Sequence, residues 1–239
     1  RSSDLGGVLS SVSQESDNKT QGMMLFPRFA ADYAASNRTT LSLGAFFGGG
    51  GQFRPTENTE IVSTVNGVTT QSQRLSENMR EFKPAGFQAG FKHSYPKAGR
   101  ELTGDFNYFG GTNQYDGLFT TDYLKNNVIT GTQIQKNVGS GKNSFITAQL
   151  DYVTPIKNEG TIETGLRAQI NDLENQILNT IKPVGTDVYK TISAASANYE
   201  STNKVYAAYF SISGKASKTL SYKIGLRGES SEYEGKLLN

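Results

Sequence analysis

Cysteine and tryptophan are absent from this 239-residue sequence, and histidine occurs once, at His93. Without cysteine the chain has no disulfide framework, no thiol nucleophile and no thiolate ligand for zinc or an iron–sulfur cluster. A strong excess of one charge is also lacking, because 24 Lys and Arg face 22 Asp and Glu, a formal net charge of +2. The sequence therefore predicts no metal, no cofactor and no nucleic-acid partner.

Long hydrophobic runs are missing as well. The longest apolar stretch, Val205 to Phe210, is far shorter than the roughly 20 residues of a membrane-spanning helix, and the mean hydropathy is −0.50. The chain nevertheless contains 13 Phe, 12 Tyr and 26 Gly. A disordered chain has few aromatic residues, so we expect a folded protein without a membrane-spanning helix.

Apolar and polar residues alternate along the chain, most clearly between Thr219 and Glu229. A period of two residues is typical of a β-strand with two chemically different faces. The same pattern predicts eight strands in all: Met24 to Ala35, Thr39 to Phe53, Phe82 to Tyr95, Arg100 to Phe109, Ser144 to Thr154, Thr161 to Asn171, Tyr199 to Ser213 and Thr219 to Glu229.

Short and long connections alternate between these strands. Short turns at 36–38, 96–99, 156–160 and 215–218 each close a hairpin, and long polar connections at 54–80, 110–143 and 171–198 separate the hairpins. Outer-membrane β-barrels have this arrangement, with short periplasmic turns, long extracellular loops and strands of roughly 9–11 residues or more. We therefore predict an all-β, antiparallel transmembrane barrel segment of about eight strands, with hairpins at about 23–53, 82–109, 144–170 and 199–233.

Side-chain placement supports a membrane barrel. Tyrosines lie close to the four short turns, as in the aromatic girdle at a membrane interface: Tyr33, Tyr95, Tyr152 and Tyr222. Charged residues occupy the polar parity of the strands, where we expect them to face the lumen: Lys92, Asp105, Asp151, Glu163, Arg167, Lys223, Arg227 and Glu229. The opposite parity, with Leu150, Leu166 and Ile224, should face lipid.

The two ends of the sequence predict an incomplete barrel. Residues 1–22 are rich in Ser and Asp and are interpreted as a loop tail, and the last six residues, 234–239, contain no aromatic final strand. Unpaired backbone groups in hydrocarbon cost several kcal/mol each, so the sheet must close with further strands. We expect an internal segment of a larger barrel, with no plug domain visible in these residues.

Two successive hairpins resemble a known family. The first runs through Leu150-Asp-Tyr-Val-Thr-Pro155, Gly160 and Glu163-Thr-Gly-Leu-Arg167; the second contains Tyr206-Ala-Ala-Tyr209, Ser213-Gly-Lys-Ala-Ser-Lys218, Tyr222-Lys-Ile-Gly-Leu-Arg-Gly-Glu229 and Tyr233-Glu-Gly235. These hairpins are similar to the Bacteroidota outer-membrane β-barrel family, a group resembling TonB-dependent receptors.

The resemblance implies a 22-stranded barrel with an N-terminal plug domain. Such a receptor binds a ligand with its extracellular loops and passes it through the lumen. The implied partners are outer-membrane lipid and an inner-membrane energising complex that contacts the plug, together with other outer-membrane proteins. The implied location is the bacterial outer membrane.

Four further features of the sequence allow other interpretations. His93 lies next to Ser94 and across a hairpin from Asp105, but adjacent strand residues point to opposite faces, which makes a catalytic triad geometrically poor. Carboxylates on the polar parity are interpreted as lumen charges rather than a glycosidase pair. Residues 171–181 fit either a short amphipathic helix or a continued strand, and the glycines at 48–51 indicate a bulge or bend.

The sequence thus predicts a protein that is not an enzyme. The leading function is part of a receptor or transporter barrel in the outer membrane. A structural or accessory barrel in a larger complex is the first alternative, since the same strands would build it. The second is a secreted β-sandwich that binds a ligand with its loops.

Overall fold

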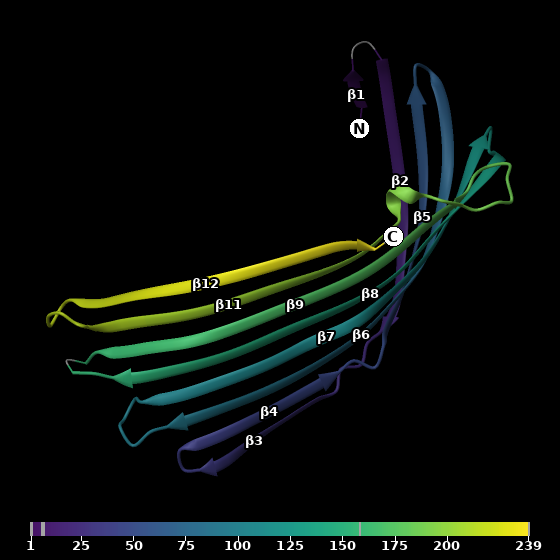
Figure 1. Cartoon of the computed structure of the whole chain (residues 1–239). Helices are drawn as coiled ribbons and strands as arrows, with labels where there is room; N and C mark the ends of the chain where they lie inside the picture. The colour runs from purple at the N-terminus through teal and green to yellow at the C-terminus, as the bar shows by residue number, and fades with distance from the viewer. Residues whose placement is uncertain (1, 6–7, 158, 239) are drawn as a thin grey trace.

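The computed structural model describes residues 2–5, 8–157 and 159–238, and these form one antiparallel sheet (Figure 1). Its strands are β1 (Ser2–Leu5), β2 (Val8–Met23), β3 (Arg28–Ser36), β4 (Thr39–Phe47), β5 (Gly51–Val65), β6 (Val68–Ser94), β7 (Glu101–Lys125), β8 (Val128–Pro155), β9 (Thr161–Lys182), β10 (Lys190–Thr191), β11 (Ala197–Lys215) and β12 (Ser221–Leu238). A 3₁₀ turn, η1 (Ser193–Ala195), precedes β11. No helix in the described residues is long and apolar enough to cross a membrane.

The sheet contains eight long strand lines. Strands β4 and β5 both pair with β6, β5 along its first half and β4 along its second, so they are two parts of one interrupted strand. Strands β2 and β3 pair with β5 and β4 and form a second interrupted strand. With β6, β7, β8, β9, β11 and β12, these two lines give the predicted eight strands and four short-turn hairpins.

The break between β4 and β5 lies at the glycines of the predicted bend. The amide of Gly48 donates to the carbonyl of Pro84 over 2.6 Å, and Gly50 has a positive φ of 63°. Proline has no N–H to donate to a ladder, so an interruption opposite Pro84 leaves no backbone donor unpaired there. The interpretation of residues 48–51 as a bend is confirmed.

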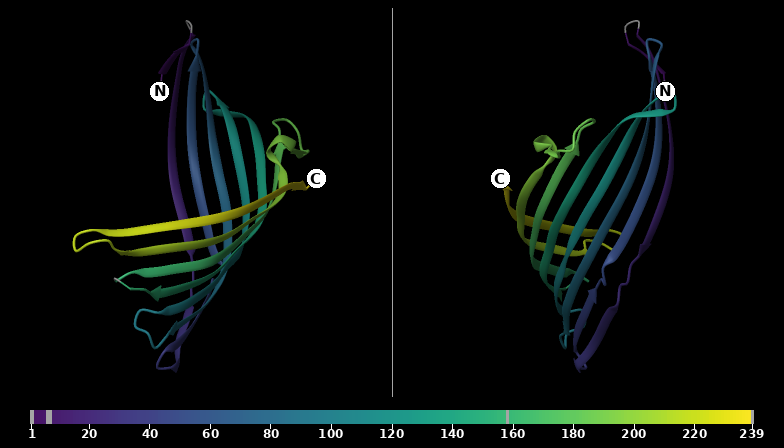
Figure 2. Two further views of the ribbon diagram at one scale, coloured as in Figure 1. Left: turned by 60° about the vertical axis from the view of Figure 1, so that its left-hand side comes forward. Right: turned by 90° about the vertical axis from the view of Figure 1, so that its right-hand side faces the viewer.

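The sheet is open at both edges. Among the described residues, β3 pairs with β4 alone and β12 pairs with β11 alone. Figure 2 shows a curved sheet whose two edges, marked by the purple and yellow ends of the chain, do not meet along their length. The predicted absence of closure within these residues is therefore confirmed, and β12 presents a free row of backbone N–H and C=O groups.

Two expectations about the connections were wrong. The stretch assigned to a loop tail, 1–22, contains β2, which pairs with β5 from Ser10 to Met23. The presumed long loops at 54–80 and 110–143 are strand pairs that continue the hairpins and end in two-residue turns. These segments are rich in Thr, Asn, Gln and Ser and have no continuous apolar face, so they show little alternation in hydropathy.

The third long connection is mixed. Strand β9 continues to Lys182, so residues 171–181 form a strand and the helical alternative for them was wrong. Only residues 183–196 make an irregular connection, which contains β10 and η1. The four short turns remain at the other end of the sheet, between β3 and β4, β6 and β7, β8 and β9, and β11 and β12.

A single-layer sheet leaves the chain without a hydrophobic core. Ala207, at 8% exposure, is the one buried hydrophobic residue of the described chain, whereas Leu226 is 80% exposed, Ile224 65% and Leu166 59%. Apolar area of this extent is unfavourable in water and must be covered by something apolar. A β-sandwich requires a second packed sheet, so that alternative is contradicted.

Candidate functional site

The register assigns all eight predicted lumen residues to one face of the sheet. Residues opposite each other on neighbouring strands share a face, and Thr103, Asp151, Gly165, Tyr209 and Arg227 form one such row across β7, β8, β9, β11 and β12. The same parity carries the remaining predicted residues, Lys92, Asp105, Glu163, Arg167, Lys223 and Glu229. This side is called the polar face below.

The opposite parity forms the apolar face. Near the short turns this face carries Leu150, Leu166, Phe210 and Leu226 on β8, β9, β11 and β12, and this part of it is called the apolar band below. On β11 its side chains are more exposed than those of the polar face: Tyr206 is 48% exposed and Phe210 46%, against 8% for Ser211. The parity assignment made from the sequence therefore separates the two faces correctly, and the apolar face has the composition of a lipid-facing surface.

Tyrosine and histidine side chains gather on the apolar face near the short turns. The rings of His93 and Tyr95 lie edge to face at 4.6 Å, and Tyr95 is 6.2 Å from Tyr152. Nδ1 of His93 lies 2.9 Å from the Thr39 hydroxyl, and Asp105 is on the other face of the sheet. This geometry provides no triad, and the aromatic cluster fits a membrane interface.

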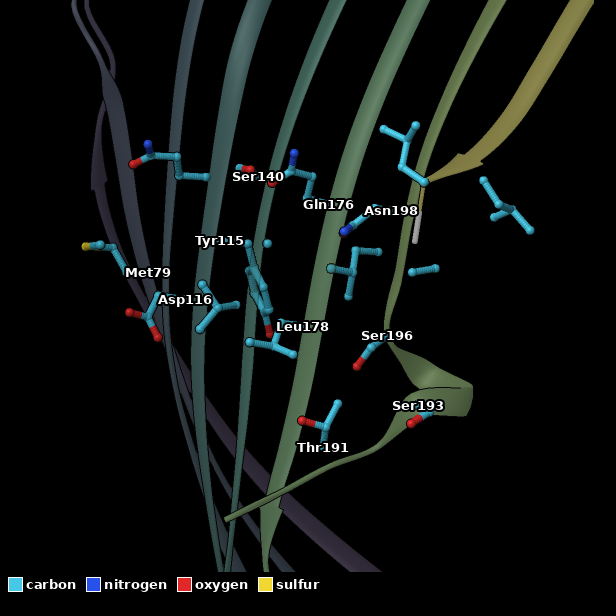
Figure 3. Close-up of a pocket in the computed structure, with 17 residues that line it drawn as sticks. Met79, Tyr115, Asp116, Ser140, Gln176, Leu178, Thr191, Ser193, Ser196 and Asn198 are labelled. Carbon is cyan, nitrogen blue, oxygen red and sulfur yellow. The ribbon is translucent and has the colours of Figure 1, made fainter.

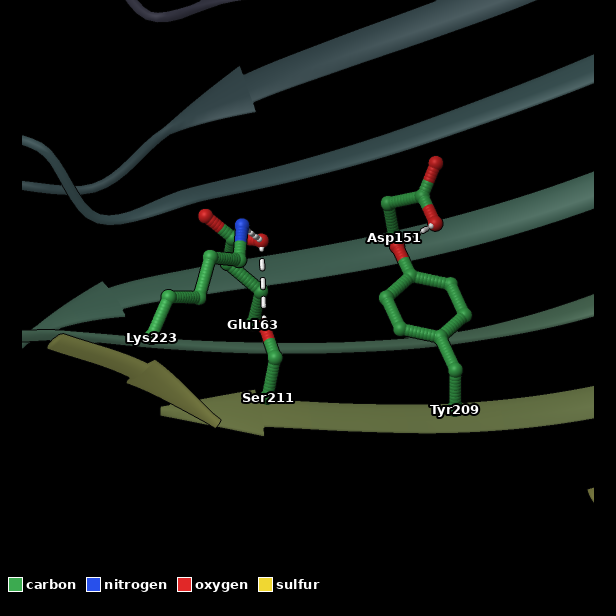
Figure 4. Close-up of polar contacts among 5 residues, drawn as sticks. All are labelled: Asp151, Glu163, Tyr209, Ser211 and Lys223. Carbon is green, nitrogen blue, oxygen red and sulfur yellow. Dashed lines mark hydrogen bonds and ion pairs between the residues drawn. The ribbon is translucent and has the colours of Figure 1, made fainter. Parts of the chain in front are cut away.

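A polar network, made of two neighbouring groups of contacts, involves four strands of the polar face (Figure 4). The Lys223 ammonium lies 2.7 Å from Oε2 of Glu163, which also accepts a hydrogen bond of 3.2 Å from the Ser211 hydroxyl. The Tyr209 hydroxyl donates to Oδ1 of Asp151 over 2.5 Å, on the far side of β9. The network therefore ties β8, β9, β11 and β12 together near the short turns.

Other predicted residues make local contacts. Asp151 also accepts from the Gln149 amide at 2.7 Å, Arg227 pairs with Glu229 at 3.0 Å, and Lys92 pairs with Glu101 at 2.9 Å. Arg167 donates to the Gln169 amide oxygen at 3.4 Å, and Asp105 lies opposite Gly90 and Gln149. The eight residues thus form several small clusters along one wall rather than a single centre.

Sequence reasoning missed the neutral members of this wall. Tyr209 and Ser211 complete the network, and their positions on the parity of Glu163 and Asp151 follow only from the register of β11 against β9. Within the sequence, the spacing of two between Tyr209 and Ser211 is the one signal that they share a face.

A second feature lies in the part of the sheet beyond the apolar band. A cavity of about 960 Å³ is bounded by β6 to β9, by the connection before β11 and by the end of β12 (Figure 3). Its polar lining includes Gln114, Asp116, Ser140, Gln176 and Asn198, and Met79, Val138 and Leu178 contribute apolar surface. This site could not be predicted from the sequence, because its residues come from seven strands and η1, and only strand pairing brings them together.

Eight long amphipathic strands, short turns at one end and an exposed apolar face define this chain as an outer-membrane β-barrel segment. It belongs to the outer membrane protein beta-barrel family, whose model matches residues 93–239. The chain is accordingly located in the bacterial outer membrane.

Comparison with solved structures gives distant likenesses. The ferric citrate transporter FecA, in its unliganded form, matches with a TM-score of 0.32 and 10% identity over 90% of this chain. OpdL of Pseudomonas aeruginosa matches with a TM-score of 0.12 and 7% identity over 97% of both chains. The present chain spans 38% of the FecA chain. No curated protein matches it.

Proposed function

We propose that this chain forms part of a receptor or transporter barrel of the TonB-dependent type, of the kind that it resembles in Bacteroidota. The open eight-strand sheet with one polar wall is the observation that supports this proposal. A closed membrane barrel removes the unpaired edges of β3 and β12 by adding strands. The proposed complete barrel is therefore wider than eight strands and has room for a solute path.

In this proposal the polar face lines the lumen. The charged and hydroxyl groups around Asp151, Glu163 and Lys223 offer donors and acceptors of both signs near the short-turn end. A plug domain that carries the contact to an inner-membrane energising complex would bind against this wall. The proposal assigns no catalytic residue, no cofactor and no nucleic-acid partner, and its other partner is outer-membrane lipid.

Ligand capture is assigned to the opposite end of the sheet. The β5–β6 and β7–β8 hairpins and the connection 183–196 all lie there, away from the four short turns. In outer-membrane barrels the short turns are periplasmic, so these segments would be extracellular. They are the first groups that a solute outside the cell would meet.

Energy-dependent uptake is the test. A strain lacking the gene and its parent are grown in a complex medium, with and without a protonophore, and the solutes left in the medium are compared by mass spectrometry. We expect at least one solute that the parent depletes and that neither the mutant nor the protonophore-treated parent depletes. A mutant with unchanged solute depletion and altered envelope integrity would instead support a structural or accessory barrel.

A further inference from the structure

The cavity beyond the apolar band contains a ladder of amide and hydroxyl groups. Gln114, Ser140, Gln176 and Asn198 lie directly opposite one another on β7, β8, β9 and β11. Because neighbouring strands are about 4.8 Å apart, the four residues form a row roughly 14 Å long on one face. Each amide offers both donors and an acceptor, and each hydroxyl offers both roles.

An apolar row runs beside this ladder. Met79, Val138 and Leu178 are in register with Asp116, two residues along each strand from the ladder, and so share its face. Val138 is 47% exposed and Leu178 50%. A ligand that covers both rows would meet hydrogen-bonding groups on one side and hydrocarbon on the other.

The irregular connection supplies a third wall, which is held in place by a buried asparagine. Asn179 is 7% exposed; its backbone amide donates to the Ser196 hydroxyl over 2.9 Å, and its carbonyl accepts from the amide of Ile192 over 2.8 Å. The Asn179 side-chain amide also donates to the Ala195 carbonyl. The hydroxyls of Thr191 and Ser193 on this connection also line the cavity (Figure 3).

The polar chemistry of the cavity is neutral apart from one carboxylate, Asp116. Burial raises the pKa of the Tyr115 phenol, whose hydroxyl donates to the Asn78 side chain over 2.7 Å, so this residue stays uncharged. The Arg80 guanidinium is stacked 5.4 Å from the Tyr115 ring. The Asp116 carboxylate would repel an anionic ligand. The hydroxyl groups of a neutral ligand, by contrast, would find both hydrogen-bond donors and acceptors in the cavity.

We propose that this cavity binds a neutral oligosaccharide. Pyranose rings present C–H surfaces to an apolar row and hydroxyls to an amide ladder, which is the combination that the two rows offer. The inference does not depend on transport. The ladder has the same parity as the apolar face, with no bulge between them on β7, β8 or β9, so the saccharide comes either from solution or from a glycolipid of the membrane in which the barrel sits.

The test uses the complete barrel that contains this chain, purified in detergent and probed with an array of neutral and sulfated oligosaccharides. We expect neutral members to bind, and the double variant Gln114→Ala, Gln176→Ala to weaken that binding about tenfold or more, because two hydrogen-bonding side chains are lost. Asn113→Ala is the matched control, since Asn113 adjoins Gln114 on β7 but lies on the opposite face. Ser140→Trp, which fills the middle of the row, should abolish binding, and retained heat-modifiable mobility on gels verifies that each variant is folded.

A second arm separates the two sources of saccharide. The same complete barrel is reconstituted in phosphatidylethanolamine vesicles with and without digalactosyl diacylglycerol, and array binding is repeated. Competition by the glycolipid supports a membrane source, and unchanged array binding supports a soluble one. Stronger binding of sulfated than neutral oligosaccharides, an equal loss in Asn113→Ala, or no neutral ligand in either arm would overturn the proposal.

Discussion

The Tyr209 hydroxyl reaches Asp151 across the full width of strand β9, over a residue that has no side chain. Gly165 lies opposite both residues in the register, and a Cβ added there would come within 2.3 Å of Asp151 Oδ1 and 2.4 Å of Tyr209 Cε1. Figure 4 shows the Tyr209 ring lying across the strand with its hydroxyl at the Asp151 carboxylate. The hydrogen bond between Tyr209 on β11 and Asp151 on β8 therefore requires that residue 165 has no side chain.

Gly165→Ala should destabilise the chain by about 1–3 kcal/mol, because the added methyl group displaces the ring. The cost should largely disappear in a Tyr209→Ala background, where the ring is gone and the Asp151 side chain, released from its hydrogen bond with Tyr209, can rotate away from the added methyl group. Urea unfolding of the four variants of this cycle in detergent measures the coupling. Additive effects of the two substitutions would show that the ring does not occupy the space above Gly165.

Leu166 lies near the middle of the apolar band. Leu166→Arg should lower the free energy of unfolding in a lipid bilayer by about 2–4 kcal/mol, because a guanidinium replaces hydrocarbon on the face assigned to lipid. Val128→Arg is the control. Val128 begins β8 at the end of the β7–β8 hairpin that lies away from the short turns, and it is 64% exposed. Its expected cost is small because water solvates the new charge there. Equal costs for both variants in bilayer refolding would contradict the assignment of the apolar face to lipid.

The absence of cysteine makes the two faces open to chemical labelling. Arg167→Cys on the polar face should react with a membrane-impermeant maleimide about tenfold or more faster than Leu166→Cys on the apolar face, because the reactive thiolate forms in water and is disfavoured in hydrocarbon. The measurement is labelling of intact outer membranes followed by gel shift. Faster reaction at position 166 would reverse the assignment of the faces.

Gly67→Ala should lower the free energy of unfolding by about 1–2 kcal/mol through backbone strain alone. Gly67 has a φ of 79° in the turn between β5 and β6, and a Cβ there meets no atom within 4 Å. Gly228→Ala is the control, because a Cβ at that site also meets nothing but the backbone is an extended strand. Thermal unfolding in detergent should separate the two, and equal stability would show that the turn relaxes without cost.

The apolar band could be predicted from the sequence because alternation survives wherever one face meets lipid. Around Leu150 and Leu166 apolar residues recur at every second position, and each leucine is followed by a charged residue, Asp151 or Arg167, so parity alone assigned their faces. The parts of the hairpins farther from the short turns, residues 54–80 and 110–143, are rich in Thr, Asn, Gln and Ser on both faces. Their two faces therefore differ little in hydropathy. A usable signal was present at the tip of β5–β6, where Asn66-Gly67 is a favoured two-residue hairpin turn.

The sites were harder to predict than the strands. A charged residue on the polar parity reveals its face but not its partner, because partners such as Tyr209 for Asp151 depend on register between strands 58 residues apart in the chain. The amide ladder of Gln114 and Gln176 has the same origin. Neither the polar network nor the amide ladder corresponds to a local sequence motif. Each forms only through the exact register of several neighbouring strands.

Strand length sets how far the protein extends from the cell. Strand β8 has 28 residues, roughly 90 Å at about 3.3 Å per residue, whereas a strand that crosses a bilayer needs only about 9–11 residues. Even with a tilt of about 45°, well over half of this strand stands clear of the hydrocarbon. Its hairpin with β7 ends at Asn126 and Asn127, so in the proposed orientation the tip projects well beyond the membrane surface, where bacteriophage, antibodies and large solutes would meet it before they reach the lipid.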